Sequence, residues 1–284
     1  MSDCTFSPSL CHIELGAIRR NFGRMGQPQA LMPVIKSDAY GHGLVPVARV
    51  LAEAGAQRFA VGTVSEGMAL RDAGLRQTIV PLLGALTDVD WQGAVMQGLT
   101  PVVGNFDQLE RAAAHCHAGR TLRVAIKCET GMGRLGFSEA ELPQVIDRLR
   151  TTQGLEPDMV LSHFSCADVP EQEAYTQDQV RRFTAMSDAL RGVFPEIKRS
   201  LCNTAGTIGR PEAHFEICRP GISLYGGNPF TGTAWQDMGA RLGLEWAMSV
   251  SAPVIEVRQV AEGRSVSYGR LFTAQKPATV AVVA

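Results

Sequence analysis

The chain has 284 residues, of which 45% are hydrophobic, and its formal net charge at neutral pH is −1. This length allows one large barrel or two ordinary domains with a sizeable core. The balanced charge gives no support to nucleic-acid binding or to attachment at a membrane surface, and no apolar run approaches membrane-spanning length.

The seven cysteines are odd in number and scattered, and no two of them form a CxxC pair. A disulfide framework and a metal site are therefore not expected, and a reducing cytoplasm fits this cysteine usage best. Residues 1–6 also lack the charged and apolar regions of a secretory signal. We therefore expect a cytoplasmic protein without a bound metal.

Short β-rich segments alternate with helical patterns from residue 32 to about residue 225. Amphipathic spacing marks many of the intervening stretches, including 66–73, 109–115, 142–149 and 180–190. Strands are expected at Met32–Ile35, Phe59–Gly62, Thr78–Leu82, Pro101–Val103, Leu122–Lys127, Met159–Ser162, Arg199–Cys202 and Phe215–Cys218. Eight strands with helices between them predict an α/β fold, a (β/α)8 TIM-type barrel.

The pattern changes near Trp235, after which β-rich segments predominate. Strands are expected at Ala247–Glu256, Ser265–Tyr268 and Ala278–Ala284. The sequence thus predicts two domains, a barrel over residues 1–235 and an all-β C-terminal domain over residues 236–284. The last strand has no closing turn and would leave an unpaired apolar edge, so the second domain is expected to be incomplete.

The most informative segment ends the first expected strand at Lys36 and continues to Gly43. Gly41 and Gly43 permit unusual backbone angles, and helical spacing begins at Leu44. A lysine at a strand end, partly withdrawn from water, can lose its proton and attack a carbonyl carbon to form a Schiff base. Taken alone, however, a lysine before a glycine turn is more often a solvated surface residue.

Further polar residues follow the later strands, at the end of the barrel where such folds keep their functional groups. Arg134 lies in the glycine-rich segment after the fifth strand, and His163 ends the sixth. Four more residues follow the seventh and eighth strands, namely Asn203, Thr204, Gly221 and Arg219. Singly, His163 is more often a structural histidine, and the loop at Asn203 is a weak phosphate signal. Their convergence on one rim indicates a site for an anionic ligand.

The segment Lys36–Gly43 resembles the pyridoxal-phosphate attachment site of the alanine racemase family, and the later motifs follow in the order of that family. The resemblance extends from about His12 to the last residue. It implies a pyridoxal 5'-phosphate enzyme that interconverts L-alanine and D-alanine and supplies D-alanine for cell-wall peptidoglycan. Because the family continues beyond the end of this chain, the chain is expected to be a C-terminally truncated member.

The resemblance also implies a role for each site residue. Lys36 would carry the cofactor, and Arg134 would contact the cofactor's phenolic oxygen and the substrate carboxylate. His163 would lie beside the cofactor ring and Arg219 would face its nitrogen, which would keep that nitrogen unprotonated and disfavour transamination. Lys127 matches a lysine that is carbamylated in some relatives. The residues implied at or beside the cofactor phosphate are Tyr40, Asn203, Thr204, Gly221 and Ile222.

Racemisation needs acid–base groups on opposite faces of the reacting carbon. Lys36 would serve one face, and Tyr268 matches the second base of the family. Positive charge from Arg219 and His163 is expected to favour the phenolate form of this tyrosine. In relatives the tyrosine reaches the active site of the other subunit, which implies a head-to-tail homodimer with shared active sites.

Two alternatives stay open at this point. The first is a broad-specificity amino-acid racemase that acts on serine or lysine. The second is a non-catalytic protein that binds pyridoxal phosphate, which would need Lys36 and a phosphate site but no second base. The presence of Tyr268 in its motif favours the enzyme. The early end of the chain also leaves open whether this polypeptide is active or dimeric.

Overall fold

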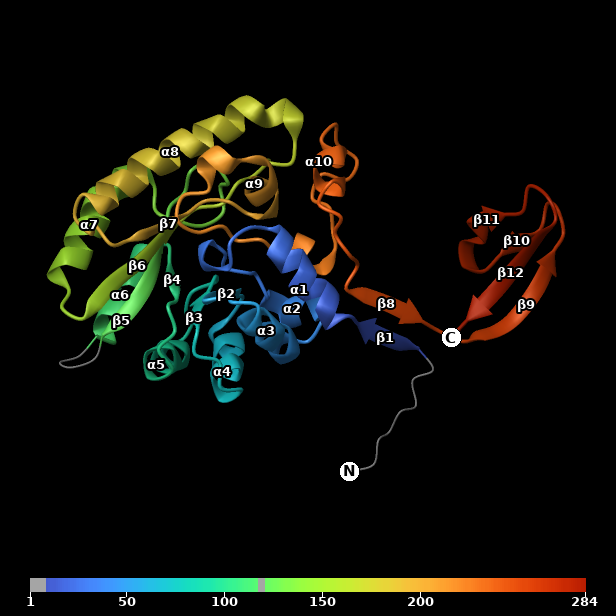
Figure 1. The fold of residues 1–284 in the computed structure, drawn as a ribbon, viewed down its shortest axis with the longest axis horizontal. Helices are drawn as coiled ribbons and strands as arrows, with labels where there is room; N and C mark the ends of the chain where they lie inside the picture. Colours follow the sequence, from blue (N-terminus) through green and yellow to red (C-terminus); the bar gives the residue numbers. More distant parts are fainter. Residues whose placement is uncertain (1–8, 117–120) are drawn as a thin grey trace. The chain divides into compact units, whose positions relative to one another are not determined.

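The computed structural model describes residues 9–116 and 121–284 (Figure 1). They form two compact units, one of residues 14–247 and one that combines the described residues up to Ile13 with Met248–Ala284. The sequence-based division at residues 235 and 236 stays a prediction. Within the described part of the chain, no helix is both long and apolar enough to cross a membrane.

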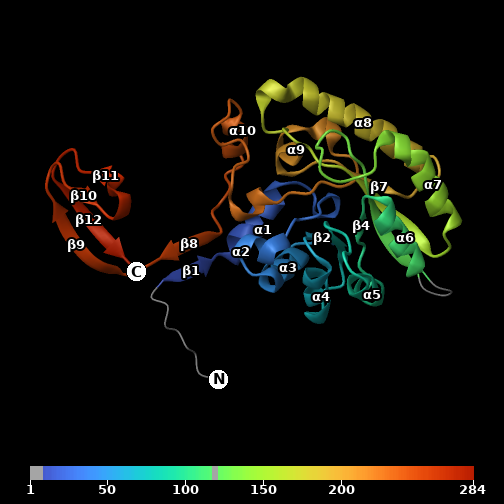
Figure 2. The same cartoon turned by 180° about the vertical axis from the view of Figure 1, so that it is seen from behind.

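The larger unit is a ring of short parallel strands with helices around it (Figures 1 and 2). One sheet pairs β2 with β3, and a second has the order β4-β5-β6-β7. The Thr100 N–H donates to the Ile79 carbonyl at 2.9 Å and links the two sheets. The strands are β2 (Arg58–Val61), β3 (Thr78–Pro81), β4 (Val102–Val103), β5 (Leu122–Lys127), β6 (Leu155–Leu161) and β7 (Lys198–Ser200).

The first and eighth expected strands are reduced to single bridges that close the ring. Leu31 bridges Cys218, and Val34 bridges Ala60, both in parallel orientation. A longer ladder does not form because Pro33 has no N–H to donate. On the other side, Phe215 has a φ of 46°, which interrupts the extended chain. The (β/α)8 architecture is therefore confirmed, although two of its eight segments are not strands.

The interior of the ring is filled by apolar side chains from nearly every segment. These side chains are Met32, Val34, Ala60, Val80, Val102, Ala125, Met159, Leu161 and Ile217. Such a barrel is a packed core without a pore. Polar groups are therefore excluded from the middle and lie where the strands end.

Helices follow the strands, and the four amphipathic segments predicted from the sequence fall within α4, α6, α7 and α8 or extend one residue past their ends. Thr63 and Thr87 begin α4 and α5 with capping boxes, in which the threonine hydroxyl and an acidic residue three positions later satisfy free amides. The helices are α1 (Leu15–Arg24), α2 (Lys36–Gly41), α3 (Leu44–Glu53), α4 (Val64–Asp72), α5 (Asp88–Met96), α6 (Phe106–Ala114), α7 (Leu142–Thr151), α8 (Glu173–Arg191), α9 (Thr204–Gly209) and α10 (Gln236–Ala240).

The smaller unit consists of paired antiparallel strands. β1 (Leu10–Ile13) pairs with β8 (Met248–Ser251), β9 (Val254–Val260) with β12 (Ala278–Val283), and β10 (Ser265–Val266) with β11 (Phe272–Thr273). The expected strand 247–256 is divided between β8 and β9 at Pro253, which cannot donate to a ladder. The last strand, expected to be unpaired, bonds to β9 along one edge.

Candidate active site

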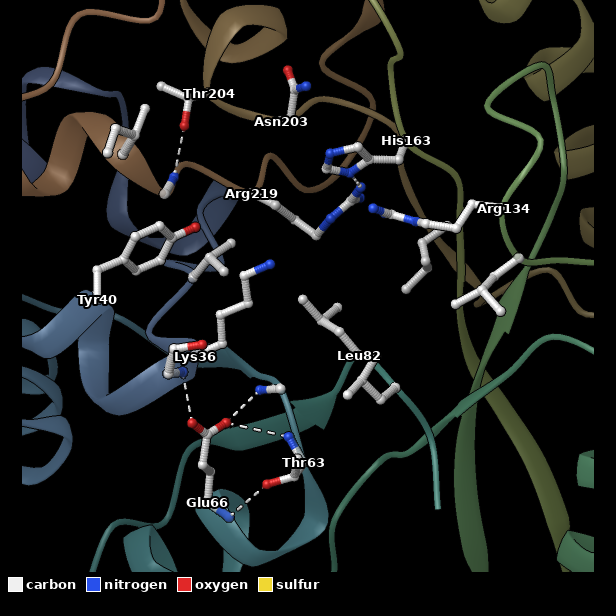
Figure 3. A pocket seen from close by; sticks show the side chains of 18 of the residues that line it. Lys36, Tyr40, Thr63, Glu66, Leu82, Arg134, His163, Asn203, Thr204 and Arg219 are labelled. Carbon is white, nitrogen blue, oxygen red and sulfur yellow. Dashed lines mark hydrogen bonds between the residues drawn. The ribbon is translucent and has the colours of Figure 1, made fainter. Parts of the chain in front are cut away.

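A cavity of about 510 Å³ opens at the rim of the barrel where the strands end (Figure 3). Ten of the eleven site residues that the sequence predicts contribute to its lining. These ten are Lys36, Tyr40, Lys127, Arg134, His163, Asn203, Thr204, Arg219, Gly221 and Ile222. The eleventh, Tyr268, lies in the smaller unit at the start of the 3-10 turn Tyr268–Arg270 and is 98% exposed.

Lys36 begins α2, which is a left-handed turn. Four consecutive residues that are not glycine, Ser37–Tyr40, have φ between 53° and 56°. Each such residue costs about 1–2 kcal/mol relative to the right-handed conformation. A turn of this kind persists only where surrounding bonds hold it in place. The side chain of Lys36 points from it into the cavity (Figure 3).

The side of the cavity next to Tyr40 has the features of a phosphate cradle. The Gly221 N–H donates to Thr204 Oγ1 at 2.8 Å, and Asn203 caps α9 by accepting from the Gly206 N–H at 3.0 Å. A Cβ at Gly221 would lie 2.8 Å from the Tyr40 hydroxyl, so only glycine allows this close approach. Burial raises the pKa of Tyr40, which leaves its hydroxyl as a donor.

Buried Arg219 and half-buried His163 form a pair on the opposite side. Arg219 donates through Nη1 to the Ser200 carbonyl at 2.8 Å and through Nη2 to His163 Nδ1 at 3.2 Å and to the Ser162 carbonyl. Because a guanidinium only donates, Nδ1 of His163 accepts and its proton lies on Nε2. Burial lowers the pKa of Arg219 to about 10, so the guanidinium is still charged at neutral pH.

His163 is neutral in this environment. Burial, followed by the charge of Arg219, lowers the pKa of His163 well below its ordinary value. The expectation that His163 and Arg219 together supply positive charge therefore needs correction, since the charge comes from Arg219 alone. The imidazole is a hydrogen-bond acceptor held against the guanidinium.

Lys127 ends β5, contributes to the lining of the cavity and is almost fully buried. Burial, with the charges of Arg219 and Arg134 as further causes, lowers the pKa of Lys127 to about 7. In Figure 3 the side chain of Arg134 points toward Arg219 and His163. A substantial share of Lys127 is therefore a neutral amine at neutral pH.

Glu66 also lines the cavity, and the sequence analysis did not identify it. It accepts the N–H groups of Ser37 at 2.6 Å and Gly62 at 2.6 Å, and so joins α4 to the turn that carries Lys36. The spacing of Thr63 and Glu66, typical of a capping box, was the available signal. It predicts a helix start but not the second bond to a distant turn.

Two family models match this chain, one after the other. The model described as "Alanine racemase, N-terminal domain" matches residues 13–229, and "Alanine racemase, C-terminal domain" matches residues 247–284. The chain belongs to the alanine racemase family. The predicted cofactor, pyridoxal phosphate, and the predicted isomerase class are those of this family.

Individual relatives agree with the family models. An alanine racemase from Nitratidesulfovibrio vulgaris (strain Miyazaki F) is 47% identical over 96% of this chain and 73% of its own length. The crystal structure of alanine racemase from Streptomyces lavendulae is 32% identical, with a TM-score of 0.87 over 98% of this chain and 73% of that chain. Alanine racemase from Bartonella henselae, solved with covalently bound pyridoxal phosphate, is 25% identical, with a TM-score of 0.82 over 97% and 74%.

Proposed function

We propose that this chain interconverts L-alanine and D-alanine, with pyridoxal phosphate held covalently by Lys36 in the cavity at the barrel rim. The observation that carries the proposal is the Lys36 side chain, which points into a cavity lined by Arg134, Arg219 and the Gly221 cradle. D-alanine made in this way would supply cell-wall peptidoglycan. A cytoplasmic location agrees with the six described cysteines, all of which are free thiols.

The donors around the cavity suit each part of the cofactor. Gly221 has no side chain, and the hydroxyls of Tyr40 and Thr204 lie beside it, where they would hold a phosphate group. Arg219 is charged and would face the ring nitrogen, with neutral His163 beside the ring. Among the described residues that line the cavity, Glu66 is the one carboxylate, and its oxygens are bonded to backbone amides. The lining therefore favours an anionic ligand.

When bound, pyridoxal phosphate withdraws electrons and makes the Cα–H bond of an attached amino acid acidic. Lys36 would then take or return the Cα proton on one face through its Nζ atom. On the other face, Tyr268 of the partner subunit would do the same through its hydroxyl oxygen. Arg134 would hold the substrate carboxylate and so fix which face each base meets. Charged Arg219 would leave the ring nitrogen unprotonated, which favours return of the proton over transamination.

We also propose that Lys127 is carbamylated. A neutral amine reacts with CO₂, and the product releases one proton and carries a negative charge. The pKa of the Lys127 amine, about 7, makes the neutral form available at neutral pH. Carbamylation would replace the ammonium group of Lys127 with an anion next to Arg219 and Arg134. This anion could orient Arg134 by charge-assisted hydrogen bonds.

A homodimer follows as a proposal from Tyr268. This residue and Leu271 are 98% and 95% exposed in the smaller unit. With Phe272, which is 52% exposed, they form a group of exposed large side chains, and such groups are typical of contacts with another protein. We propose a head-to-tail dimer in which each subunit lends Tyr268 to the active site of its partner subunit.

The first test asks whether Lys36 binds the cofactor. Purified protein incubated with pyridoxal phosphate should become yellow, and borohydride reduction followed by peptide mass spectrometry should place the label on Lys36. Lys36→Ala should lose the label and the racemisation of alanine. Lys198→Ala removes a lysine paired with Asp158 at 3.6 Å outside the cavity and should keep both. A colourless protein without label on Lys36 would refute the proposal.

Substrate choice is tested with the same preparation. Racemisation of alanine should exceed that of serine and lysine, since the family that the chain matches acts on alanine. A clear preference for serine or lysine would favour the broad-specificity alternative.

Tyr268→Phe should abolish exchange at Cα but retain the coloured complex, whereas unchanged turnover would contradict the two-base scheme.

A further inference from the structure

The left-handed turn after Lys36 is held by a carboxylate from a different element. Glu66 Oε1 accepts the Ser37 N–H at 2.6 Å and the Asp38 N–H at 3.3 Å. These amides lie at the start of the turn, where backbone N–H groups have no partner within a helical segment. Glu66 therefore accepts hydrogen bonds from the backbone N–H groups of the turn that lie nearest to Lys36.

The second oxygen of Glu66 fixes the carboxylate to the barrel. Oε2 accepts the N–H groups of Gly62 at 2.6 Å and Thr63 at 3.2 Å, at the end of β2. A Cβ at Gly62 would lie 3.0 Å from Oε2 and 3.5 Å from the Cβ of Lys36. Both oxygens are thus committed to backbone amides, and the strand end, Glu66 and Lys36 are in close contact (Figure 3).

The far end of the turn has its own support from a buried histidine. His42 Nδ1 lies 3.1 Å from the Ala39 carbonyl and 3.0 Å from the Tyr40 carbonyl, so Nδ1 carries a proton and donates. Glu66 holds the amides at the start, and His42 holds the carbonyls at the end. The bonds to the end of β2, however, come from Glu66.

We propose that Glu66 is a positioning residue for Lys36, which fixes the backbone from which the lysine amine is directed into the cavity. It acts through the amides of Ser37 and Asp38 and does not touch the reacting atoms. The inference rests on the proposed function, in which that amine binds pyridoxal phosphate. Loss of Glu66 would allow the turn to relax, and the amine would then meet the cofactor aldehyde in the correct geometry less often.

The chain contains a matched control for this idea. Asp90 occupies the same capping-box position on α5 and accepts the N–H groups of Thr87 at 2.9 Å and Leu86 at 3.1 Å. It is not part of the cavity lining. A change at Asp90 therefore removes the same kind of helix cap without a bond to the Lys36 turn.

The experiment compares Glu66→Gln with Asp90→Asn in the full chain. An amide keeps the size of the side chain but presents donors to backbone N–H groups, so half of its acceptor capacity is lost. Hydrogen exchange at Ser37 and Asp38 should accelerate in Glu66→Gln and remain as in the unchanged protein in Asp90→Asn. The affinity for pyridoxal phosphate should fall roughly 10- to 100-fold in Glu66→Gln only, the effect of losing hydrogen bonds to a charged group.

Unchanged exchange and unchanged cofactor affinity in Glu66→Gln would overturn the inference. If that variant does not fold, Gly62→Ala replaces it, since the added methyl group would lie 3.0 Å from Oε2 and push the carboxylate aside without removing it. Faster exchange at Ser37 and Asp38 is the expected result. If the unchanged protein is not labelled at Lys36, the proposed function fails. The exchange measurement then still decides whether Glu66 holds the turn.

Discussion

Lys127 is a buried amine whose charged form is unfavourable in the folded protein. Its pKa is about 7 in the fold, against an ordinary value of 10.5. Below pH 7 both the folded and the unfolded chain hold the proton, and the fold carries the full penalty of the buried charge. Between these two values the unfolded chain binds more protons, so the contribution of Lys127 to the free energy of unfolding rises with pH.

Lys127→Met should remove this pH dependence. In CO₂-free buffer, the free energy of unfolding of the unchanged protein should gain on that of the variant as the pH rises from about 7 to about 10. Urea unfolding at several pH values gives the measurement, and Lys198→Met, at an ion pair outside the cavity, serves as the control. If the free energies of unfolding of the unchanged protein and of Lys127→Met changed in parallel with pH, the pKa of Lys127 would not be lowered by folding.

At the scale of elements, the short helix α9 depends on its cap. Asn203 accepts the Gly206 N–H at 3.0 Å and donates to the Phe164 carbonyl at 3.4 Å. Asn105 caps α6 in the same way, by accepting the Gln108 N–H at 2.8 Å, but it is not part of the cavity lining. The two asparagines therefore separate the effect of a cap from the effect of the cavity.

Asn203→Ala and Asn105→Ala should each lower the free energy of unfolding by about 1 kcal/mol. Only Asn203→Ala should also weaken the binding of pyridoxal phosphate, because it loosens the loop that presents Thr204 to the Gly221 amide. Thermal unfolding and cofactor titration of both variants provide the comparison. Equal cofactor affinity in the two variants would argue against a phosphate site at α9.

The sequence was a good guide to which side chains meet, wherever the order of the barrel segments brings them together. Arg134, His163 and Arg219 follow the fifth, sixth and eighth segments of the barrel, and a barrel brings the ends of such segments to one rim. The left-handed turn was not predictable, because serine, alanine and tyrosine have no preference for that conformation. Glu66 was missed for the same reason, since its bond to Ser37 exists only once the turn has formed. The pairing of β1 with β8 depends on residues more than 230 positions apart and left no local signal.

At the scale of the whole molecule, the proposed dimer makes a quantitative prediction. Lys36→Ala and Tyr268→Phe should each be inactive alone. If each active site takes Lys36 from one subunit and Tyr268 of the partner subunit, a mixed dimer contains one site with both unchanged residues. Random reassociation of equal amounts should therefore restore about a quarter of the unmutated activity, as half of the dimers are mixed and each has one working site.

Activity assays after joint unfolding and refolding of the two variants provide the measurement. Each variant refolded alone is the control. No recovery in the mixture, with both variants shown to be dimeric, would mean that Lys36 and Tyr268 do not act across subunits.

The bridges that close the barrel would give a bound cofactor a structural effect in addition to its chemical one. The segment that leads to Lys36 meets its neighbour near Gly221 through the Leu31–Cys218 bridge and the Val34 N–H, which donates to the Pro220 carbonyl at 2.8 Å. A molecule joined to Lys36 and seated on Gly221 would fasten the two sides of this seam together. Bound pyridoxal phosphate would then stabilise the barrel as well as take part in the reaction, and its loss would remove that support from this seam.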